Sequence, residues 1–352
     1  MNKNSKKLAL YIFLTFLVAL VAIVLRTVAC VYELEDNLIY YDDDKLNIAA
    51  GITLTIGVLL ITVLSFFLKK EPLKATFSSP ATYIPAGIVG AALLLFSLGM
   101  NEMSRELEDV YNSGTDDVRY SIASTLAIIV ATVALLSIAH FFFTVYLTER
   151  HAQLRAYFSI ATLLLCALYA AYLYFNPTVP LNAPNKLSEQ MAYLFVALFF
   201  LYETRISLGR ELWRPYIAFG LIGAMFSSYA SIPVILTYLI RGVTVTDTLH
   251  SAILLFAFFV FIAARLCLTV TIYKEGESPE MTTLREFAEA RQSELDTPSV
   301  QDGTQISIDE LINITASIEG DEPAEDVGAP IGDITAEEQM ALDVENNYGA
   351  EI

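Results

Sequence analysis

The sequence has few of the residues on which most catalytic and metal sites depend. Its 352 residues include three cysteines, three histidines and one tryptophan. The histidines are scattered and form no zincin motif; they are His140, His151 and His250. The cysteines lie in or beside apolar runs with no paired spacing, which predicts small buried hydrophobes and neither a disulfide framework nor a zinc site. They are Cys30, Cys166 and Cys267.

Other catalytic signatures are also missing from the sequence. It contains no phosphate-binding loop, no dinucleotide fingerprint and no serine nucleophile with an evident base. Asp and Glu do not occur in the middle of any apolar run, which argues against a carboxylate proton relay. No catalytic residue, metal ion, cofactor or nucleic acid is therefore expected.

Long apolar runs are the dominant feature that is present. The chain is 55% hydrophobic with a mean hydropathy of +0.53, far above what the core of a soluble domain requires. A helix that crosses the hydrocarbon layer needs about 20 apolar residues, and eight runs approach this length. They cover residues 8–25, 48–68, 81–100, 121–146, 157–175, 191–208, 216–240 and 249–273. The predicted fold is an all-α polytopic membrane protein, with an eight-helix transmembrane domain over residues 1–274.

The first run has two alternative interpretations. It is longer than the roughly 7–15 apolar residues of a signal peptide, and no clean cleavage site follows it, so a first membrane span is favoured. The segment Thr27–Cys30 resembles a bacterial lipoprotein box only faintly, because Arg26 interrupts it. The first run is therefore predicted to stay in the mature protein as a helix.

The basic residues predict the orientation in the membrane. With a cytoplasmic N-terminus, twelve Lys or Arg residues lie on the inner side and six on the outer side. The excess on the inner side satisfies the positive-inside rule. The chain is predicted to be a multi-pass protein of the cell membrane, with the lipid bilayer as its first partner and both termini in the cytoplasm.

The C-terminal segment differs sharply in composition from the rest of the chain. Residues 275–352, called the acidic tail below, hold 21 acidic residues, and their only basic residues are Arg285 and Arg291. This composition predicts a largely disordered cytoplasmic tail. A short helix over 307–317 is predicted to bind a cytoplasmic protein, because its apolar residues cannot bury themselves alone. These residues are Ile308, Leu311, Ile312 and Ile318.

Two predicted outer loops are rich in acidic residues. The first contains Glu33–Asp36 and Asp42–Asp44, and the second contains Glu106–Asp109 and Asp116–Asp117. Several oxygen ligands are what a hard cation such as Ca²⁺ requires, so a cation site is one interpretation. Solvated hairpins without a metal are favoured, because no Gly-punctuated ligand loop accompanies the acids.

A similarity between two segments of the chain indicates a possible four-plus-four duplication of the helices. The segment 83–91 resembles 216–224, and under the duplication these segments open the third and seventh spans. His140 and Arg265 would then occupy matching positions near the inner ends of the fourth and eighth spans. Both segments contain Gly-x-x-Gly spacing, which permits close helix contact.

A charged turn between the sixth and seventh runs is the strongest candidate site. It contains Glu203, Arg205 and Arg210 at the predicted inner membrane boundary. Arg265 lies at a matching depth in the eighth run, and a lone charge at that depth is costly, so Glu203 is predicted to pair with Arg265. The alternative is that Arg265 reaches the lipid headgroups and Glu203 pairs locally with Arg210.

The seventh run carries a second candidate site, a pocket lined by polar side chains. Pro233 frees a backbone carbonyl one turn earlier, which nearby serine hydroxyls can satisfy locally, or the serines can line a polar cavity. Helix packing through small residues is the alternative. The residues concerned are Ser227, Ser228, Tyr229, Ser231 and Pro233.

Three classes of function remain open from the sequence. The first is a non-enzymatic membrane scaffold or sensor whose acidic tail binds a partner. The second is a transporter of a small or amphiphilic molecule, with its pocket around the seventh span. The third is an enzyme at the inner leaflet that uses Glu203 and Arg210. The scaffold or sensor is favoured.

Overall fold

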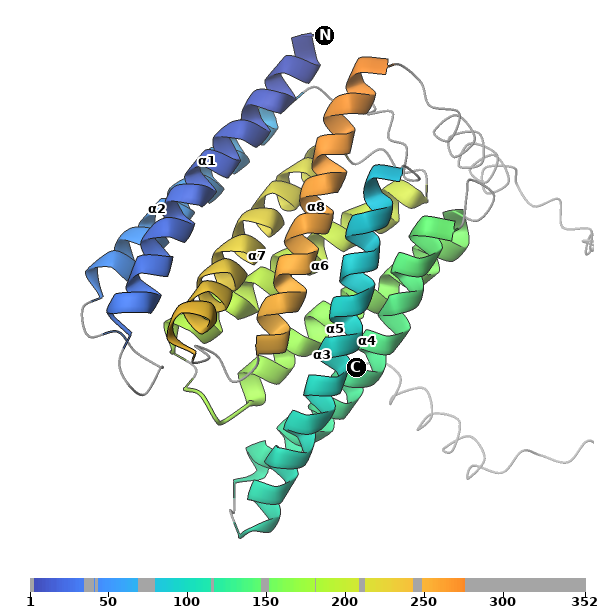
Figure 1. Cartoon of the computed structure of the whole chain (residues 1–352). Coiled ribbons are helices and arrows are strands. Elements are labelled where there is room, and N and C mark those ends of the chain that lie inside the picture. The colour runs from blue at the N-terminus through green and yellow to red at the C-terminus, as the bar shows by residue number, and fades with distance from the viewer. Residues whose placement is uncertain are drawn as a thin grey trace, which may run out of the picture. The chain divides into compact units, whose positions relative to one another are not determined.

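The structure, a computed structural model, describes residues 3–34, 41, 44–68, 80–114, 117–146, 152–180, 182–208, 213–242 and 249–275. These residues belong to one compact unit, Met1–Asp296, and form eight α-helices (Figure 1). The helices are α1 (Lys3–Tyr32), α2 (Lys45–Phe66), α3 (Pro80–Asn112), α4 (Val118–Tyr146), α5 (Ala152–Phe175), α6 (Pro184–Ser207), α7 (Trp213–Arg241) and α8 (Leu249–Glu275). Residues 276–352 of the acidic tail lie outside the described part.

Seven of these helices are long and apolar enough to cross a bilayer, which indicates a membrane-embedded protein. The exception is α6, which begins at Pro184, seven residues before the apolar run that predicted it. Proline is favoured in the first turn of a helix, where its missing N–H removes no intrahelical hydrogen bond. The earlier start brings Lys186 and Glu189 into a helix that already carries Glu203 and Arg205. By composition alone, therefore, the structure supports seven of the eight predicted spans.

Six of the helices close into a ring. Each helix from α3 to α8 packs against the next, and α8 also packs against α3. The hairpin of α1 and α2 lies outside this ring: α1 packs against α2, α7 and α8, and α2 packs against α1 and α7 (Figure 1). Under a four-plus-four duplication α2 would correspond to α6 and α3 to α7. The two halves differ here, since α6 packs against the helix that follows it, α7, whereas α2 packs against α1 and α7. The four-plus-four duplication stays a prediction.

Helices that follow one another in the chain run in opposite directions along the bundle (Figure 1). The helices α1, α3, α5 and α7 finish at one end of the bundle, called the Arg26 end below. The helices α2, α4, α6 and α8 finish at the other, called the Glu203 end. The start of α1 and the finish of α8 lie together at the Glu203 end (Figure 1).

The pair α3 and α4 is longer than the sequence predicted. The helix α3 has 33 residues and continues well past the end of the apolar run at residue 100. Met103 and Leu107 are buried one turn apart, and the hydroxyl of Ser104 donates to the carbonyl oxygen of Ser124 on α4 at 3.0 Å. This packing extends the hairpin, so the acidic segment Glu106–Asp109 lies on a helix and not in a loop.

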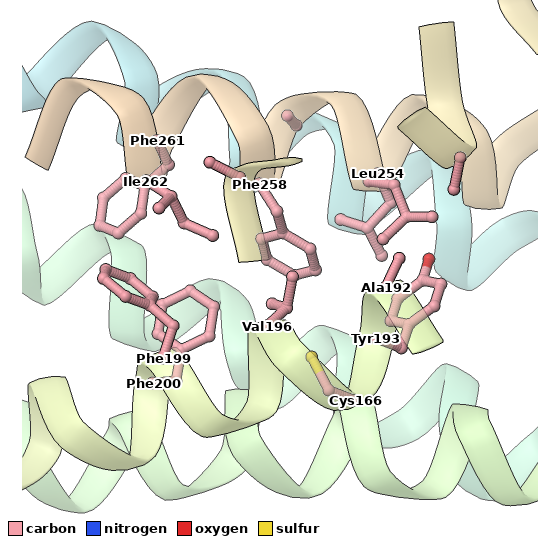
Figure 2. Packing of buried hydrophobic residues seen from close by; sticks show 14 of the residues in the cluster. Cys166, Ala192, Tyr193, Val196, Phe199, Phe200, Leu254, Phe258, Phe261 and Ile262 are labelled. Carbon is pink, nitrogen blue, oxygen red and sulfur yellow. The ribbon is translucent and has the colours of Figure 1, made fainter. Parts of the chain in front are cut away.

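Aromatic side chains fill the space between α6 and α8 (Figure 2). The ring of Phe200 on α6 lies 5.6 Å from Phe258 and 6.0 Å from Phe261, both on α8. Phe141 on α4 reaches the same cluster, 5.1 Å from Phe261. Because lipid is as apolar as these side chains, close van der Waals packing is what stabilises such helix contacts in a membrane.

The predicted burial of the cysteines is only partly correct. Cys30 and Cys166 are buried, and Cys166 on α5 contributes to the cluster between α6 and α8 (Figure 2). Cys267 is exposed, because it lies on the face of α8 opposite its packed side chains. The prediction of a buried hydrophobe is therefore wrong for Cys267.

The two Gly-x-x-Gly segments have different environments. A side chain at Gly220 on α7 would lie 3.0 Å from Leu266 and 3.2 Å from Phe199, so this position allows α6 and α8 to approach α7 closely. Gly87 and Gly90 on α3 have no atom of a neighbouring element within 4 Å of where a side chain would begin, among the residues that the structure describes. The prediction of close helix contact is confirmed for α7 and wrong for α3.

Candidate functional site

Glu203 on α6 and Arg265 on α8 form a buried ion pair. The Nη2 atom of Arg265 lies 2.8 Å from Oε1 of Glu203, and their side chains are only 2% and 3% exposed. The guanidinium also lies over the ring of Phe261, with its central carbon 5.3 Å from the ring centroid. The sequence-based prediction that these two residues pair is confirmed, and burial of both charges between helices explains why Arg265 does not extend toward the headgroups.

Of the other two residues of the predicted charged cluster, only Arg205 belongs to the described part of the chain. Arg205 is exposed, and its guanidinium carbon lies 5.8 Å from the ring of Tyr202 on the same helix. Arg210 lies outside the described residues, so the predicted role of Glu203 and Arg210 in an enzyme is not tested. Of the three predicted residues that the structure describes, it brings together two, Glu203 and Arg265.

Further buried polar side chains pair with one another on α4, α5 and α6. The hydroxyl groups of Ser159 on α5 and Thr204 on α6 are hydrogen-bonded to each other, and Thr204 also donates to the carbonyl oxygen of Phe200 at 2.7 Å. The Nδ1 atom of His140 on α4 lies 3.0 Å from the hydroxyl of Thr162 on α5. All four side chains are buried, so a polar layer joins α4, α5 and α6 near the paired α6 and α8.

A second polar cluster, at the Arg26 end, was not predicted. Arg26 on α1 is 1% exposed, and its Nη2 atom donates to Oδ1 of Asn185 at 2.8 Å and to the hydroxyl of Ser188 at 2.7 Å. Its guanidinium lies over the ring of Tyr229 on α7, 4.2 Å from the centroid. The hydroxyl of Tyr41 also donates to Oδ1 of Asn185, at 3.1 Å. This cluster, called the Arg26 cluster below, joins α1, α6, α7 and the connection between α1 and α2.

A buried carboxylate lies one turn after Asn185 on α6 and makes contacts of its own. Glu189 is 5% exposed, and its Oε1 atom accepts hydrogen bonds from Tyr169 on α5, at 3.1 Å, and from the hydroxyl of Ser251 on α8. Tyr193 on α6 donates to the carbonyl oxygen of Ser251 at 3.2 Å. The carboxylate of Glu189 therefore links α6 to α5 and α8. These hydrogen bonds are necessary because a buried carboxylate cannot be satisfied by water or lipid.

The predicted polar residues of α7 are all buried, and two of the serines bond to their own helix. Ser228 donates to the carbonyl oxygen of Met225 at 3.0 Å, and Ser231 donates to that of Ser227 at 2.6 Å. Neither reaches the carbonyl one turn before Pro233, so packing of the helix accounts for both hydroxyls. Tyr229 is the member of this group that faces a charge, that of Arg26.

A small pocket lies elsewhere on α7, at the Glu203 end. Its volume is about 10 Å³, which is room for one water molecule. The residues that line it come from α1, the end of α2 and the first half of α7, and they include Tyr11, Leu64 and Leu221. This pocket does not include the predicted residues Ser227–Pro233.

The predicted cation site and partner-binding helix are largely outside the described residues. Within the described part, no three His, Cys, Asp or Glu side chains gather as metal ligands would. Asp42, Asp43 and Asp116 lie outside that part, as do the four apolar residues of the tail helix, Ile308, Leu311, Ile312 and Ile318. The cation site therefore stays the disfavoured alternative to solvated acidic hairpins, and binding of a partner by the tail stays a prediction.

The unpredicted residues gave only weak signals in the sequence. Arg26 stands at the end of the first apolar run, where a boundary arginine that reaches the headgroups is the usual interpretation. Asn185, Ser188 and Glu189 precede the sixth apolar run and belong to the helix only because it starts at Pro184. The available signal was that Ser188 and Glu189 follow Asn185 by three and four residues, which places all three on one face of a helix.

Comparison with protein-family models, with curated proteins and with solved structures found no match for this chain.

Proposed function

We propose that this chain is a multi-pass membrane protein of the cell membrane that acts as a non-enzymatic sensor or scaffold through its acidic tail. All eight helices cross the bilayer in this proposal, and both termini are cytoplasmic. The packing of α6 between α5 and α7 supports its crossing, because Lys186, Glu189 and Glu203 are buried against protein and not exposed to lipid. The twelve basic residues on one side support the orientation.

The buried ion pair is the observation that carries the proposal. Arg265 ties α8 to Glu203 of α6, and α8 continues to Glu275, where the acidic tail begins. A shift of α8 against α6 would therefore move the start of the tail. When α6 and α8 slide apart, the charges of Glu203 and Arg265 both lose their compensation. Positions of α8 between the paired and a fully shifted state are therefore unfavourable. The pair thus supports a link between the membrane bundle and the tail.

The experiment uses the full chain in native membranes, with a photoreactive amino acid in place of Asn313. Irradiation is expected to give an adduct of one discrete size with a cytoplasmic protein. Changing Leu311→Asp together with Ile312→Asp should abolish the adduct, because the apolar face that needs burial is lost. The matched control, Glu310→Gln, leaves that face unchanged and should keep the adduct. Equal adducts from wild-type and double-Asp chains would contradict binding through this helix.

A second candidate function, transport of a small or amphiphilic molecule, is favoured by one observation. Tyr229, within the predicted polar segment of α7, lies against a buried guanidinium. Removal of the tail after Lys274 separates the two candidates. A transporter reconstituted in liposomes would keep its activity without the tail, whereas a scaffold or sensor would lose its function although the bundle keeps its thermal stability.

A further inference from the structure

Arg26 is a buried cation whose contacts are all neutral. Its hydrogen bonds go to the amide oxygen of Asn185 and the hydroxyl of Ser188, and its planar face lies on the ring of Tyr229. Among the residues that the structure describes, no carboxylate forms an ion pair with it. At the opposite end of the same bundle, Arg265 is equally buried but has the carboxylate of Glu203 at 2.8 Å.

This difference matters because an arginine cannot lose its charge. Arginine stays protonated under physiological conditions, so a buried guanidinium needs compensation by a neighbouring negative charge or by dipoles. With 1% of its surface exposed, Arg26 does not reach the headgroups in this conformation. One negative charge beside it would compensate the guanidinium as Glu203 compensates Arg265.

The cluster also contains donors that have no acceptor. The Nε atom of Arg26 and the Nδ2 atom of Asn185 are fully buried, and neither has a hydrogen-bond partner in the part of the chain described. The two donors belong to side chains that contact each other, since the Nη2 atom of Arg26 donates to Oδ1 of Asn185 at 2.8 Å. Two neighbouring N–H donors on or beside a guanidinium are the groups that bind the oxygens of a carboxylate or phosphate.

Tyr41 covers this cluster from the connection between α1 and α2. Tyr41 is 5% exposed, and its hydroxyl donates to Asn185 and lies 3.2 Å from the sulfur of Cys30. Its backbone forms an isolated antiparallel β-bridge with Leu34. Burial raises the pKa of the Tyr41 phenol far above its usual range, although the charge of Arg26 opposes this shift, so the phenol stays protonated.

We infer that Arg26 and Asn185 form a binding site for one small oxyanion, a carboxylate or a phosphate group, which Tyr41 covers in this structure. The oxyanion accepts hydrogen bonds from Arg26 Nε and Asn185 Nδ2, and the ring of Tyr229 packs against the face of the guanidinium. The group comes either from a free anion or from the headgroup of an anionic lipid. The inference does not depend on the proposed function, because a sensor and a transporter can both use such a site.

The test measures the melting temperature of the full chain in nanodiscs of phosphatidylcholine, with increasing sodium acetate at constant ionic strength set by sodium chloride. Acetate is expected to raise the melting temperature by a few degrees and to saturate, because a ligand that binds only the folded state stabilises it. A second set of nanodiscs contains phosphatidylglycerol. If the lipid supplies the oxyanion, these discs raise the melting temperature and remove the response to acetate.

Two variants connect either response to the Arg26 cluster. Asn185→Asp supplies a carboxylate within the protein, so it should raise the melting temperature without ligand and abolish the responses to acetate and to phosphatidylglycerol. Arg26→Gln should abolish both responses, and Asn185→Asp keeps the test decisive if Arg26→Gln does not fold. The inference is overturned if neither acetate nor phosphatidylglycerol stabilises the wild-type chain, or if Asn185→Asp retains the response.

Discussion

The imidazole of His250 on α8 occupies the space that a side chain at Gly99 on α3 would need. A β-carbon added at Gly99 would lie 2.5 Å from Nδ1 and 2.7 Å from Cγ of His250. Because Cγ is attached directly to Cβ, relief of this overlap requires either another χ1 rotamer of His250 or a shift of α8. The glycine therefore fixes how closely α3 and α8 approach where they close the six-helix ring.

Gly99→Ala is expected to lower the free energy of unfolding by about 1–3 kcal/mol, the usual cost of overpacking a close contact. The matched control is Gly90→Ala on the same helix, where no neighbouring atom lies within 4 Å among the described residues. This control should be neutral or stabilising by up to about 1 kcal/mol, since alanine is the better helix former. Thermal unfolding of the purified chain measures both, and equal effects would contradict close packing at Gly99.

Glu203→Gln and Arg265→Gln are each expected to destabilise the bundle by about 3–5 kcal/mol, because each leaves one buried charge without its partner. The exchanged pair, Glu203→Arg with Arg265→Glu, should recover most of that loss. Arg205→Gln serves as the control, because Arg205 is exposed on the same helix, and its effect should stay within about 0.5 kcal/mol. An exchanged pair no more stable than the single variants would show that the pairing contributes little.

Tyr169→Phe and Ser251→Ala are each expected to cost about 1–3 kcal/mol, because each removes a donor to the buried carboxylate of Glu189. Since both donate to the same oxygen, their effects should not add, and a double-mutant cycle should give a coupling of about 0.5–3 kcal/mol. Ser113→Ala, an exposed serine that bonds only to its own helix, is the control. Strict additivity of the two changes would indicate that they act independently of Glu189.

The topology is tested by single cysteines in a chain without its native three. Cysteines at Asn112 and Asn182 are expected to react with a membrane-impermeant maleimide on intact cells, and cysteines at Gln153 and Leu208 to react only after the cells are opened. Asn182 and Leu208 flank α6, so they report whether this charged helix crosses the membrane. Equal labelling of these two positions would mean that α6 does not cross, and the reverse pattern would invert the orientation.

Much of the fold follows from the sequence. A segment in lipid must satisfy its own backbone hydrogen bonds and is therefore helical, and its contact with hydrocarbon makes it a long apolar run that is visible in the sequence. Depth along each run is also readable, which is why the pairing of Glu203 with Arg265 was predictable. Which helices are neighbours is not readable from run lengths. The partners of Arg26 depend on α1 packing against α7 and lying near the start of α6, and run lengths do not specify this arrangement.

The same limit applies to small residues and to helix starts. Gly87 and Gly90 have the same spacing as Gly220 and Gly223, but only the second pair faces neighbouring helices closely. The start of α6 at Pro184 was missed because its first turns are polar, and those turns are stabilised by contacts such as Lys186 Nζ donating to the carbonyl oxygen of Asn176 at 2.7 Å. Both features depend on tertiary contacts and not on local pattern.

The separation in sequence between Arg26 and its partners has a consequence for biosynthesis. Arg26 is made with the first helix, but Asn185 follows 159 positions later. Until α6 and α7 are inserted, the guanidinium has neither its hydrogen-bond acceptors nor the ring of Tyr229, so on α1 alone it has to reach the lipid headgroups for compensation. Chains interrupted before α6 therefore hold Arg26 in a different environment from the finished molecule, in which its guanidinium is buried between α1, α6 and α7.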